Sequence, residues 1–229
     1  MNLLSGALGV IFTFKDRLDI AFILMLAAAV FDFFDGMVAR LLDAHSNIGK
    51  DLDSLSDMVS FGVLPSMMLF KLMSIQTDSD SIWCYVPLIL AIFSGLRLAK
   101  FNVDSRQTVN FIGLATPASA MICGSLAYFV SARPSSLLAY WTSGYVFIPV
   151  LAVILSALMV SEIPMFSLKI KKSTKGNIVK MKRIAFLTIA MMCFLITIVI
   201  HENWSLAILM TLSFYVLMNL VFLVLPNDE

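Results

Sequence analysis

The chain is a succession of long apolar stretches separated by short polar breaks. Apolar residues make up 60% of its 229 residues and charged residues only 14%, against about a quarter in soluble proteins. Because a membrane-spanning helix needs about 20 apolar residues, the sequence predicts an all-α, polytopic membrane protein with about eight transmembrane helices. We expect one integral membrane domain, 1–229, with helices near 2–14, 20–43, 49–74, 81–103, 114–132, 137–160, 184–200 and 205–225.

The basic residues predict how these helices are oriented. Twelve of the 16 Lys and Arg residues lie in the connections from the second helix to the third, the fourth to the fifth and the sixth to the seventh. Positive charge is retained on the cytoplasmic side of a membrane, so both termini are predicted to be cytoplasmic. We therefore expect a cell-membrane protein in contact with lipids. The net charge of +1 argues against a nucleic-acid partner, which requires a basic face.

Acidic residues are concentrated where the second predicted helix ends and the third begins. Six of the 15 fall in the segment 32–57. At 3.6 residues per turn, four of them share one arc of each helix with small and polar residues, whereas Asp51 points away. The first arc holds Asp32, Asp35, Gly36, Ala39 and Arg40, and the second holds Gly49, Asp53, Ser56, Asp57 and Ser60.

A tight turn between the two helices lets these arcs face each other at the cytoplasmic boundary. Four like charges do not remain ionised together in a low dielectric unless cations lie between them. Carboxylate oxygens favour Mg²⁺ or Mn²⁺ over Zn²⁺. The small residues leave space for a ligand close to the backbone, and the guanidinium of Arg40 suits phosphate oxygens. The pattern therefore predicts a site for a metal-bound pyrophosphate.

These residues match the pattern D-x2-D-G-x2-A-R-x8-G-x3-D-x3-D without a gap, and the chain therefore resembles the CDP-alcohol phosphotransferases. The resemblance implies a six-helix core at about 1–160, two additional helices at about 184–225, and a homodimer. It also implies that an alcohol hydroxyl displaces CMP from a CDP-linked donor with the help of Mg²⁺ or Mn²⁺, as two ions.

The resemblance assigns roles to individual positions. Asp32, Asp35 and Asp53 correspond to metal ligands. Asp57 corresponds to the general base on the acceptor hydroxyl and to a ligand of the second ion. The positions expected to bind the CDP-linked donor are Asn2, Gly36, Ala39, Arg40 and Gly49.

Three further stretches resemble the phosphatidylserine synthase branch of that family: DMVSFGVLPS, GLRLAKFNVDS and FIGLATPASA. This resemblance implies CDP-diacylglycerol and L-serine as substrates, and phosphatidylserine and CMP as products. A zwitterionic amino acid needs a cation for its carboxylate and an acceptor for its ammonium group. The candidate residues are Ser60, Arg97, Lys100, Asn102 and Arg106, with Lys100 and Asn102 as the preferred pair and Arg97 equally able to hold a donor phosphate.

Two alternatives remain open at this point. A sibling enzyme with glycerol 3-phosphate or inositol phosphate as acceptor would need more arginine than Arg97 and Arg106 supply near the fourth helix. A cation transporter would spread its carboxylates across the membrane depth, on several helices. We also expect Pro117 to kink the fifth helix, and the last two helices to be scaffold because they are almost free of polar groups.

Overall fold

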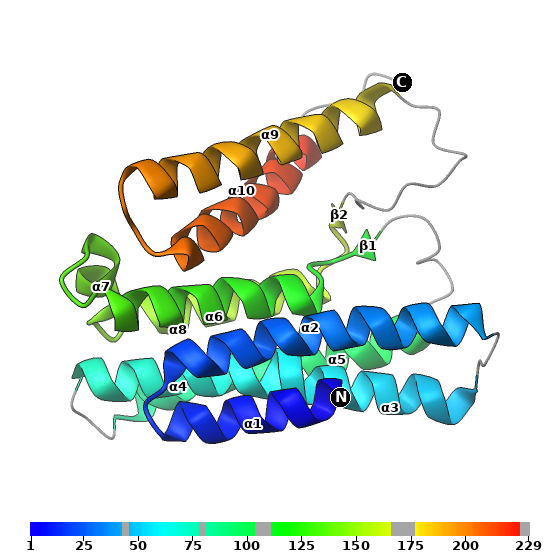
Figure 1. Cartoon of the computed structure of the whole chain (residues 1–229), viewed down its shortest axis with the longest axis horizontal. Coiled ribbons are helices and arrows are strands. Elements are labelled where there is room, and N and C mark those ends of the chain that lie inside the picture. The colour runs from blue at the N-terminus through cyan, green and yellow to red at the C-terminus, as the bar shows by residue number, and fades with distance from the viewer. Residues whose placement is uncertain (43–45, 78–80, 104–110, 166–176, 225–229) are drawn as a thin grey trace.

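The computed structural model describes residues 1–42, 46–77, 81–103, 111–165 and 177–224, and in them the chain forms a helical bundle (Figure 1). The predicted all-α architecture is confirmed. The α-helices are α1 (Asn2–Phe14), α2 (Leu18–Leu41), α3 (Asn47–Met58), α4 (Leu64–Thr77), α5 (Ile89–Val103), α6 (Thr116–Ala132), α7 (Leu137–Thr142), α8 (Phe147–Val160), α9 (Asn177–Val199) and α10 (Trp204–Val224). A π-helical turn, η1 (Val59–Val63), links α3 to α4, and a 3-10 segment, η2 (Ile82–Leu88), leads into α5. Two short strands, β1 (Phe111–Ile112) and β2 (Pro164–Met165), pair antiparallel.

Four helical segments in the described ranges are long and apolar enough to cross a membrane: Leu18–Ala39, Ile48–Thr77, Ile82–Val103 and Trp204–Val221. Four more are apolar but shorter: Asn2–Phe14, Thr116–Ala132, Phe147–Val160 and Ile184–Val199. Together they follow the eight predicted stretches. The chain is therefore a polytopic membrane protein in which several helices are shorter than a full bilayer crossing.

The core lies where α6 packs against α2, α4 and α10. Phe22 and Met25 of α2, Met68 of α4 and Leu126 of α6 are fully buried there. At one end of the bundle, Trp204 of α10 stacks on Phe22, with ring centroids 5.5 Å apart. Together with the packing of α10 along α6, this contact joins the C-terminal pair α9–α10 to the rest of the bundle.

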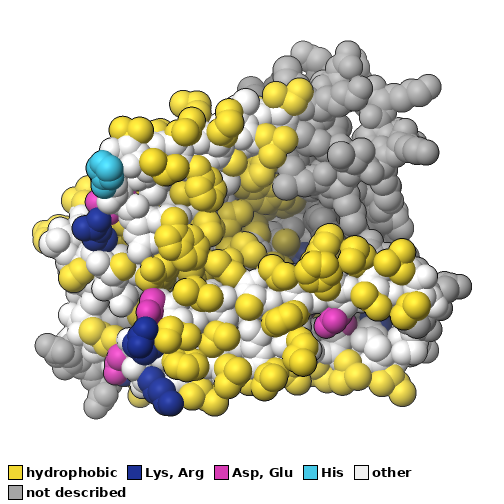
Figure 2. Space-filling view, viewed as in Figure 1, with side chains coloured by type: hydrophobic (Ala, Val, Ile, Leu, Met, Phe, Trp, Pro, Cys, Tyr) yellow, Lys and Arg dark blue, Asp and Glu magenta, His cyan; other side chains and the backbone are white. Residues whose placement is uncertain are grey.

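Charged side chains gather at the end of the bundle where α1 turns into α2 and α9 turns into α10 (Figure 2). Lys71 pairs with Asp16 at 2.9 Å, and Arg133 pairs with Glu202 at 3.2 Å. Between this end and the opposite one, the same face is largely apolar and is hollowed between α2 and the C-terminal pair (Figure 2). An apolar middle below a charged rim is the pattern of a lipid-facing surface.

The helix predicted over 49–74 is interrupted by the π-helical turn η1, directly after α3. Pro65 explains the interruption because it has no N–H to donate to the carbonyl of Phe61, and its ring would clash with that carbonyl. Such turns widen a helix and occur at functional sites. Here the turn places Ser60 in the buried interface with α1.

Two sequence-based expectations about helices are wrong in detail, and a proline explains each difference. The single helix predicted over 137–160 is two helices, α7 and α8, because a continuous helix would drive the ring of Pro149 into the carbonyl of Tyr145. Pro117 does not kink the helix that contains it, because it lies in the first turn of α6, where its missing N–H costs nothing. Gly113 precedes that helix with a φ of 76°, a conformation that glycine adopts without strain.

Gly6 allows α1 to approach η1 closely. A Cβ at this position would lie 2.9 Å from the Cα of Ser60, so the backbone of one element would have to move. We expect Gly6→Ala to lower the free energy of unfolding by about 1–3 kcal/mol, the usual cost of overpacking. Thermal unfolding in detergent measures this effect. Gly144→Ala is the matched control, because a Cβ there meets nothing within 4 Å, and an equal loss of stability in both variants would contradict the account.

Candidate active site

Three carboxylates converge at the boundary between α2 and α3. Asp32 comes from α2, and Asp53 and Asp57 come from successive turns of α3. One oxygen of each lies within 4.8 Å of the other two. Asp32 and Asp57 are half-buried and Asp53 is exposed, so the group is open on one side. Of the four carboxylates predicted to converge, one from the first arc and two from the second therefore lie together, and Asp35 does not join them.

This donor set suits a divalent cation. Three carboxylate oxygens at this separation repel one another strongly unless positive charge lies between them. Hard oxygen donors, with one side open to water and substrate oxygens, match the preference of Mg²⁺ and Mn²⁺. Among the described residues, no other group of three or more acidic, histidine or cysteine side chains converges in this way.

Asn2 ties the first helix to the carboxylates. Its Nδ2 donates a hydrogen bond of 2.9 Å to Oδ1 of Asp57, and its side chain is only 4% exposed. The carbonyl oxygen of Asn2 accepts a bond from the Ser60 hydroxyl, which fixes the start of α1 against η1. Oδ1 of Asn2 is buried and has no partner in the described part of the chain. It therefore remains available to a ligand beside Asp57.

The position of α3 is set by a cap at its N-terminus. The hydroxyl of Ser46 accepts a 3.0 Å hydrogen bond from the backbone N–H of Gly49, which satisfies one of the donors that a helix start leaves open. Residues 43–45, which precede Ser46, lie outside the described residues. A helix that begins at a fixed residue places Asp53 and Asp57 on its second and third turns, facing α2.

The other motif residues on these helices lie around the three carboxylates. Asp35 is exposed and lies outside the three-carboxylate group, one turn farther along α2. A Cβ on Gly36 would meet nothing within 4 Å, so there is open space beside the backbone of α2 at this point. Ala39 is half-buried, and Gly49 is exposed in the first turn of α3. The side chain of Arg40 lies outside the described residues.

Arg97 is a buried cation on α5, close to the start of α6. It lies on α5, is 8% exposed, and its Nη1 donates a 3.1 Å hydrogen bond to the hydroxyl of Thr116 at the start of α6. Its guanidinium carbon lies 5.8 Å from the ring centroid of Phe101. Nε of Arg97 is buried and has no partner among the described residues, so the guanidinium still has a donor to offer.

The other candidates for acceptor binding are engaged in packing. Nζ of Lys100 lies 3.8 Å from Oε1 of Glu162, and Nδ2 of Asn102 donates 2.8 Å to the hydroxyl of Ser54. The hydroxyl of Ser60 donates to the backbone of α1. The preferred pair Lys100 and Asn102 thus serves contacts between helices. Arg106 lies outside the described residues.

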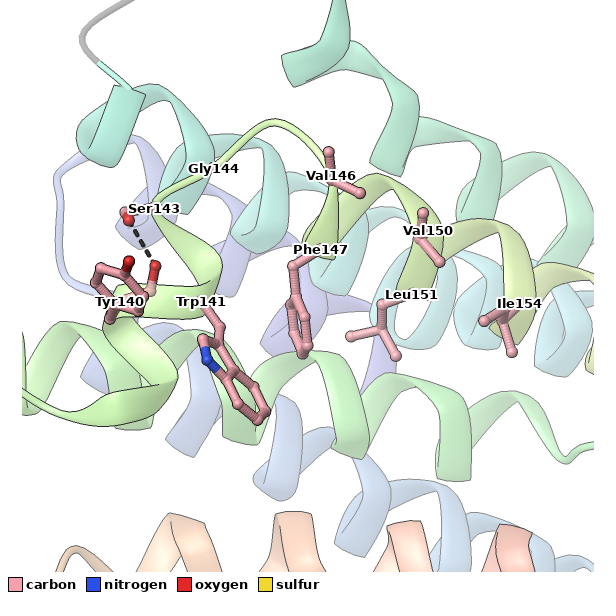
Figure 3. Close-up of a pocket in the computed structure, with 9 residues that line it drawn as sticks. All are labelled: Tyr140, Trp141, Ser143, Gly144, Val146, Phe147, Val150, Leu151 and Ile154. Carbon is pink, nitrogen blue, oxygen red and sulfur yellow. Dashed lines mark hydrogen bonds between the residues drawn. The ribbon is translucent and has the colours of Figure 1, made fainter.

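A separate pocket of about 660 Å³ opens between α7 and α8 (Figure 3). Its walls are aromatic and aliphatic, with Trp141 and Phe147 pointing into the same space. None of its lining residues, as the structure describes them, is acidic or basic. The pocket therefore has no part in the chemistry of the three carboxylates.

The sequence analysis missed two residues that shape the site. Ser46 could have been recognised as a helix cap from its position three residues before Gly49. Thr116 carries no comparable signal, because its contact with Arg97 joins two helices that the sequence alone does not place side by side.

Comparison with known proteins gives consistent matches. Residues 1–147 match the CDP-alcohol phosphatidyltransferase family. The chain is 34% identical over 162 residues to the CDP-diacylglycerol--serine O-phosphatidyltransferase of Bacillus subtilis (strain 168), a match that covers 71% of this chain and 83% of the relative.

Of two further relatives, one has the same name as the Bacillus protein and the other is named as an archaetidylserine synthase. A CDP-diacylglycerol--serine O-phosphatidyltransferase of Mycobacterium tuberculosis (strain ATCC 25618 / H37Rv) is 34% identical, over 72% of this chain and 58% of the relative. The archaetidylserine synthase of Methanothermobacter thermautotrophicus is 38% identical, over 55% of this chain and 53% of the relative. The chain thus matches little more than half the length of these two proteins.

Proposed function

The chain belongs to the CDP-alcohol phosphatidyltransferase family, and on this premise we propose that it is a membrane transferase that makes phosphatidylserine. It transfers the phosphatidyl group of CDP-diacylglycerol to the hydroxyl of L-serine and releases CMP, a step of phospholipid biosynthesis. The observation that carries the proposal is the convergence of Asp32, Asp53 and Asp57 at the spacing of the family pattern. The names of the relatives from Bacillus and Mycobacterium support serine as the acceptor.

The carboxylates have two tasks in this reaction, which are to hold metal ions and to accept a proton. Asp32, Asp53 and the neighbouring Asp35 would hold Mg²⁺ or Mn²⁺, as two ions, with Asp57 as a further ligand. When bound, such ions would supply the positive charge that the donor's pyrophosphate and the departing CMP require. Asp57 accepts the proton of the serine hydroxyl as its oxygen attacks the phosphorus, and the phosphorus–oxygen bond to CMP breaks in the same direct transfer. Asn2, bonded to Asp57, keeps one carboxylate oxygen fixed and leaves the other for the hydroxyl.

The open space beside Gly36 is assigned to the donor, together with Ala39, Arg40 and Gly49. We expect Gly36→Ala to leave folding unchanged, because a Cβ there meets no atom of the protein within 4 Å. We expect the same variant to raise the KM for CDP-diacylglycerol at least about tenfold, because the methyl group occupies space assigned to the ligand. Steady-state kinetics and thermal unfolding in detergent test the two halves of this prediction. Unchanged kinetics would remove the donor from this part of α2.

Arg97 is the residue we assign to the carboxylate of serine. It is buried, and its Nε has no hydrogen-bond partner among the described residues. A guanidinium binds a carboxylate through parallel hydrogen bonds, which a lysine cannot provide. Ser60, Lys100 and Asn102 then support the helices around the acceptor, and Arg106 stays a prediction.

The orientation in the membrane and the oligomeric state also belong to this proposal. The carboxylates lie on the C-terminal half of α2 and on α3, away from the turn between α1 and α2 where the charged rim of Lys71, Asp16, Arg133 and Glu202 gathers (Figure 2). One of the basic connections that are predicted to be cytoplasmic joins α2 to α3, the two helices that carry the carboxylates. The proposal therefore puts the carboxylates and both termini on the cytoplasmic side. A homodimer is expected from family membership alone.

Acceptor choice is tested with purified protein, CDP-diacylglycerol and Mn²⁺. Labelled serine, glycerol 3-phosphate and inositol phosphate are supplied in parallel, and label entering lipid is measured. We expect serine to be incorporated at least about a hundredfold faster, because Arg97 is the one arginine that is buried among the described side chains, and a phosphorylated acceptor would need further cations. Preference for either phosphorylated acceptor would assign the chain to the sibling activity.

A further inference from the structure

Asn2 is fixed at the start of α1, on the face that packs against η1. Its backbone carbonyl accepts a 3.2 Å hydrogen bond from the hydroxyl of Ser60, and the residue is almost fully buried. Gly6 follows one turn later on the same face, and its lack of a Cβ lets α1 approach the backbone of Ser60 closely. The side chain of Asn2 is therefore held beside the carboxylates by the packing of its own helix.

The side-chain amide of Asn2 has a donor edge and an acceptor edge. An ionised carboxylate only accepts hydrogen bonds, so the donor edge faces Asp57, with 2.9 Å between Nδ2 of Asn2 and Oδ1 of Asp57. The acceptor edge, Oδ1 of Asn2, is buried and has no hydrogen-bond partner in the described part of the chain. Because buried oxygens are almost always paired in folded proteins, this atom requires a partner that comes from outside the chain.

The unpaired oxygen of Asn2 is close to the carboxylate to which we assign the role of base. The oxygen and nitrogen of a primary amide lie about 2.3 Å apart, so Oδ1 of Asn2 is at most roughly 5 Å from Oδ1 of Asp57. In serine, the amino group and the hydroxyl are on adjacent carbons and lie about 3 Å apart in a gauche conformation. A serine whose hydroxyl approaches Asp57 therefore brings its amino group within hydrogen-bonding reach of Asn2.

We propose that Oδ1 of Asn2 binds the ammonium group of the acceptor, so that this residue selects an amino alcohol. The inference rests on the proposed function. An ammonium group donates a charge-assisted hydrogen bond, which is roughly twice as strong as the bond from a neutral hydroxyl. One amide then serves both reactants, because its NH2 orients Asp57 while its oxygen holds the amine beside the attacking hydroxyl. Asn2, which the sequence pattern assigns to the donor, is thereby assigned to the acceptor.

The test compares L-serine with 3-hydroxypropionate, which has the same hydroxyl and carboxylate but no amino group. Each labelled acceptor is supplied to the full chain in detergent with CDP-diacylglycerol and Mn²⁺, and label entering lipid is measured. Asn2→Ala should raise the KM for serine at least about tenfold and reduce the preference for serine over 3-hydroxypropionate by the same factor, the effect of one hydrogen bond to a charged group. The KM for CDP-diacylglycerol should stay within about twofold.

Two further variants separate recognition of the amine from the other tasks of Asn2. Asn2→Asp keeps an acceptor oxygen but loses the donor to Asp57, so turnover should fall while the preference for serine is kept. Ser5→Ala is the matched control, because the Ser5 hydroxyl joins the same helix to the carbonyl of Leu24 through a 2.7 Å hydrogen bond. We expect the preference for serine to stay within about twofold in this variant.

Three results would overturn the inference. Equal losses with both acceptors in Asn2→Ala would show that Asn2 only orients Asp57. A rise confined to the KM for CDP-diacylglycerol would return Asn2 to the donor. An unchanged KM for serine in Asn2→Ala would remove it from the acceptor. A wild-type protein that makes no phosphatidylserine overturns the proposed function instead.

Discussion

Asp57→Asn is expected to lower the rate of phosphatidylserine formation at saturating substrates by about two to four orders of magnitude, the contribution of a positioned general base. Asparagine has the same shape, and its carbonyl oxygen still accepts the 2.9 Å hydrogen bond from Nδ2 of Asn2. It cannot take the proton of the serine hydroxyl. Turnover measured in detergent, with Mn²⁺ and both substrates in excess, checks the prediction.

The same variant should still bind the donor. Asp32 and Asp53 remain, so at saturating Mn²⁺ the binding of CDP-diacylglycerol is expected to weaken by no more than about tenfold. Turnover within about threefold of the wild-type value would remove Asp57 from the role of base. A complete loss of donor binding would show instead that its main task is to hold metal.

Asp53→Asn is expected to lower the rate of phosphatidylserine formation by a similar factor, because it weakens metal binding. Asp53 contributes one of the three oxygens that lie within 4.8 Å of one another. Loss of a residue behind a metal ligand already costs about 10- to 100-fold in affinity, so loss of a ligand should weaken Mn²⁺ binding at least about a hundredfold. Electron paramagnetic resonance of free and bound Mn²⁺, titrated in detergent, measures this directly without turnover.

Asp51→Asn is the matched control for that measurement. Asp51 lies on the same helix, two residues away, is exposed, and is not part of the three-carboxylate group. Its replacement removes the same formal charge as Asp53→Asn. Because Asp51 lies outside the group and its charge is screened by solvent, we expect Mn²⁺ affinity and turnover to stay within about twofold of wild type. Equal losses in the two variants would contradict a site made by specific ligands.

The carboxylate cluster was predictable from the sequence because it depends on one helix pair. A four-residue interval puts Asp53 and Asp57 on the same face of α3, and the short connection from α2 to α3 allows Asp32 to lie opposite them. Both facts follow from helical geometry and a short connection. Asp35, a turn farther along α2, shares the arc but does not reach the group, because its exact reach depends on side-chain direction rather than spacing.

The acceptor side was less predictable because three separate helices contribute to it. Lys100 and Asn102 are near Arg97 in sequence, but they contact Glu162 and Ser54, whereas the buried guanidinium contacts Thr116. Those contacts depend on how α5 packs against α3, against α6 and against the segment that follows α8. Periodicity within one helix contains no information about such packing.

Local breaks in the helices also escaped prediction from hydrophobicity. Pro149 ends the continuity of α7 and α8, and Pro65 widens the turn after α3, although the apolar stretches around both are unbroken. Hydropathy indicates which segments of the chain lie in the membrane. The points at which such a segment is interrupted depend instead on the backbone hydrogen bonds that a single proline removes.

Release of CMP measured together with lipid formation tests the central claim most directly. Purified protein is incubated with CDP-diacylglycerol and Mn²⁺, with or without labelled L-serine, and both products are quantified. Direct transfer predicts one CMP for each phosphatidylserine, with neither product formed when serine or the metal is left out. CMP release that continues without serine, or that exceeds the lipid formed, would contradict direct transfer between the two substrates.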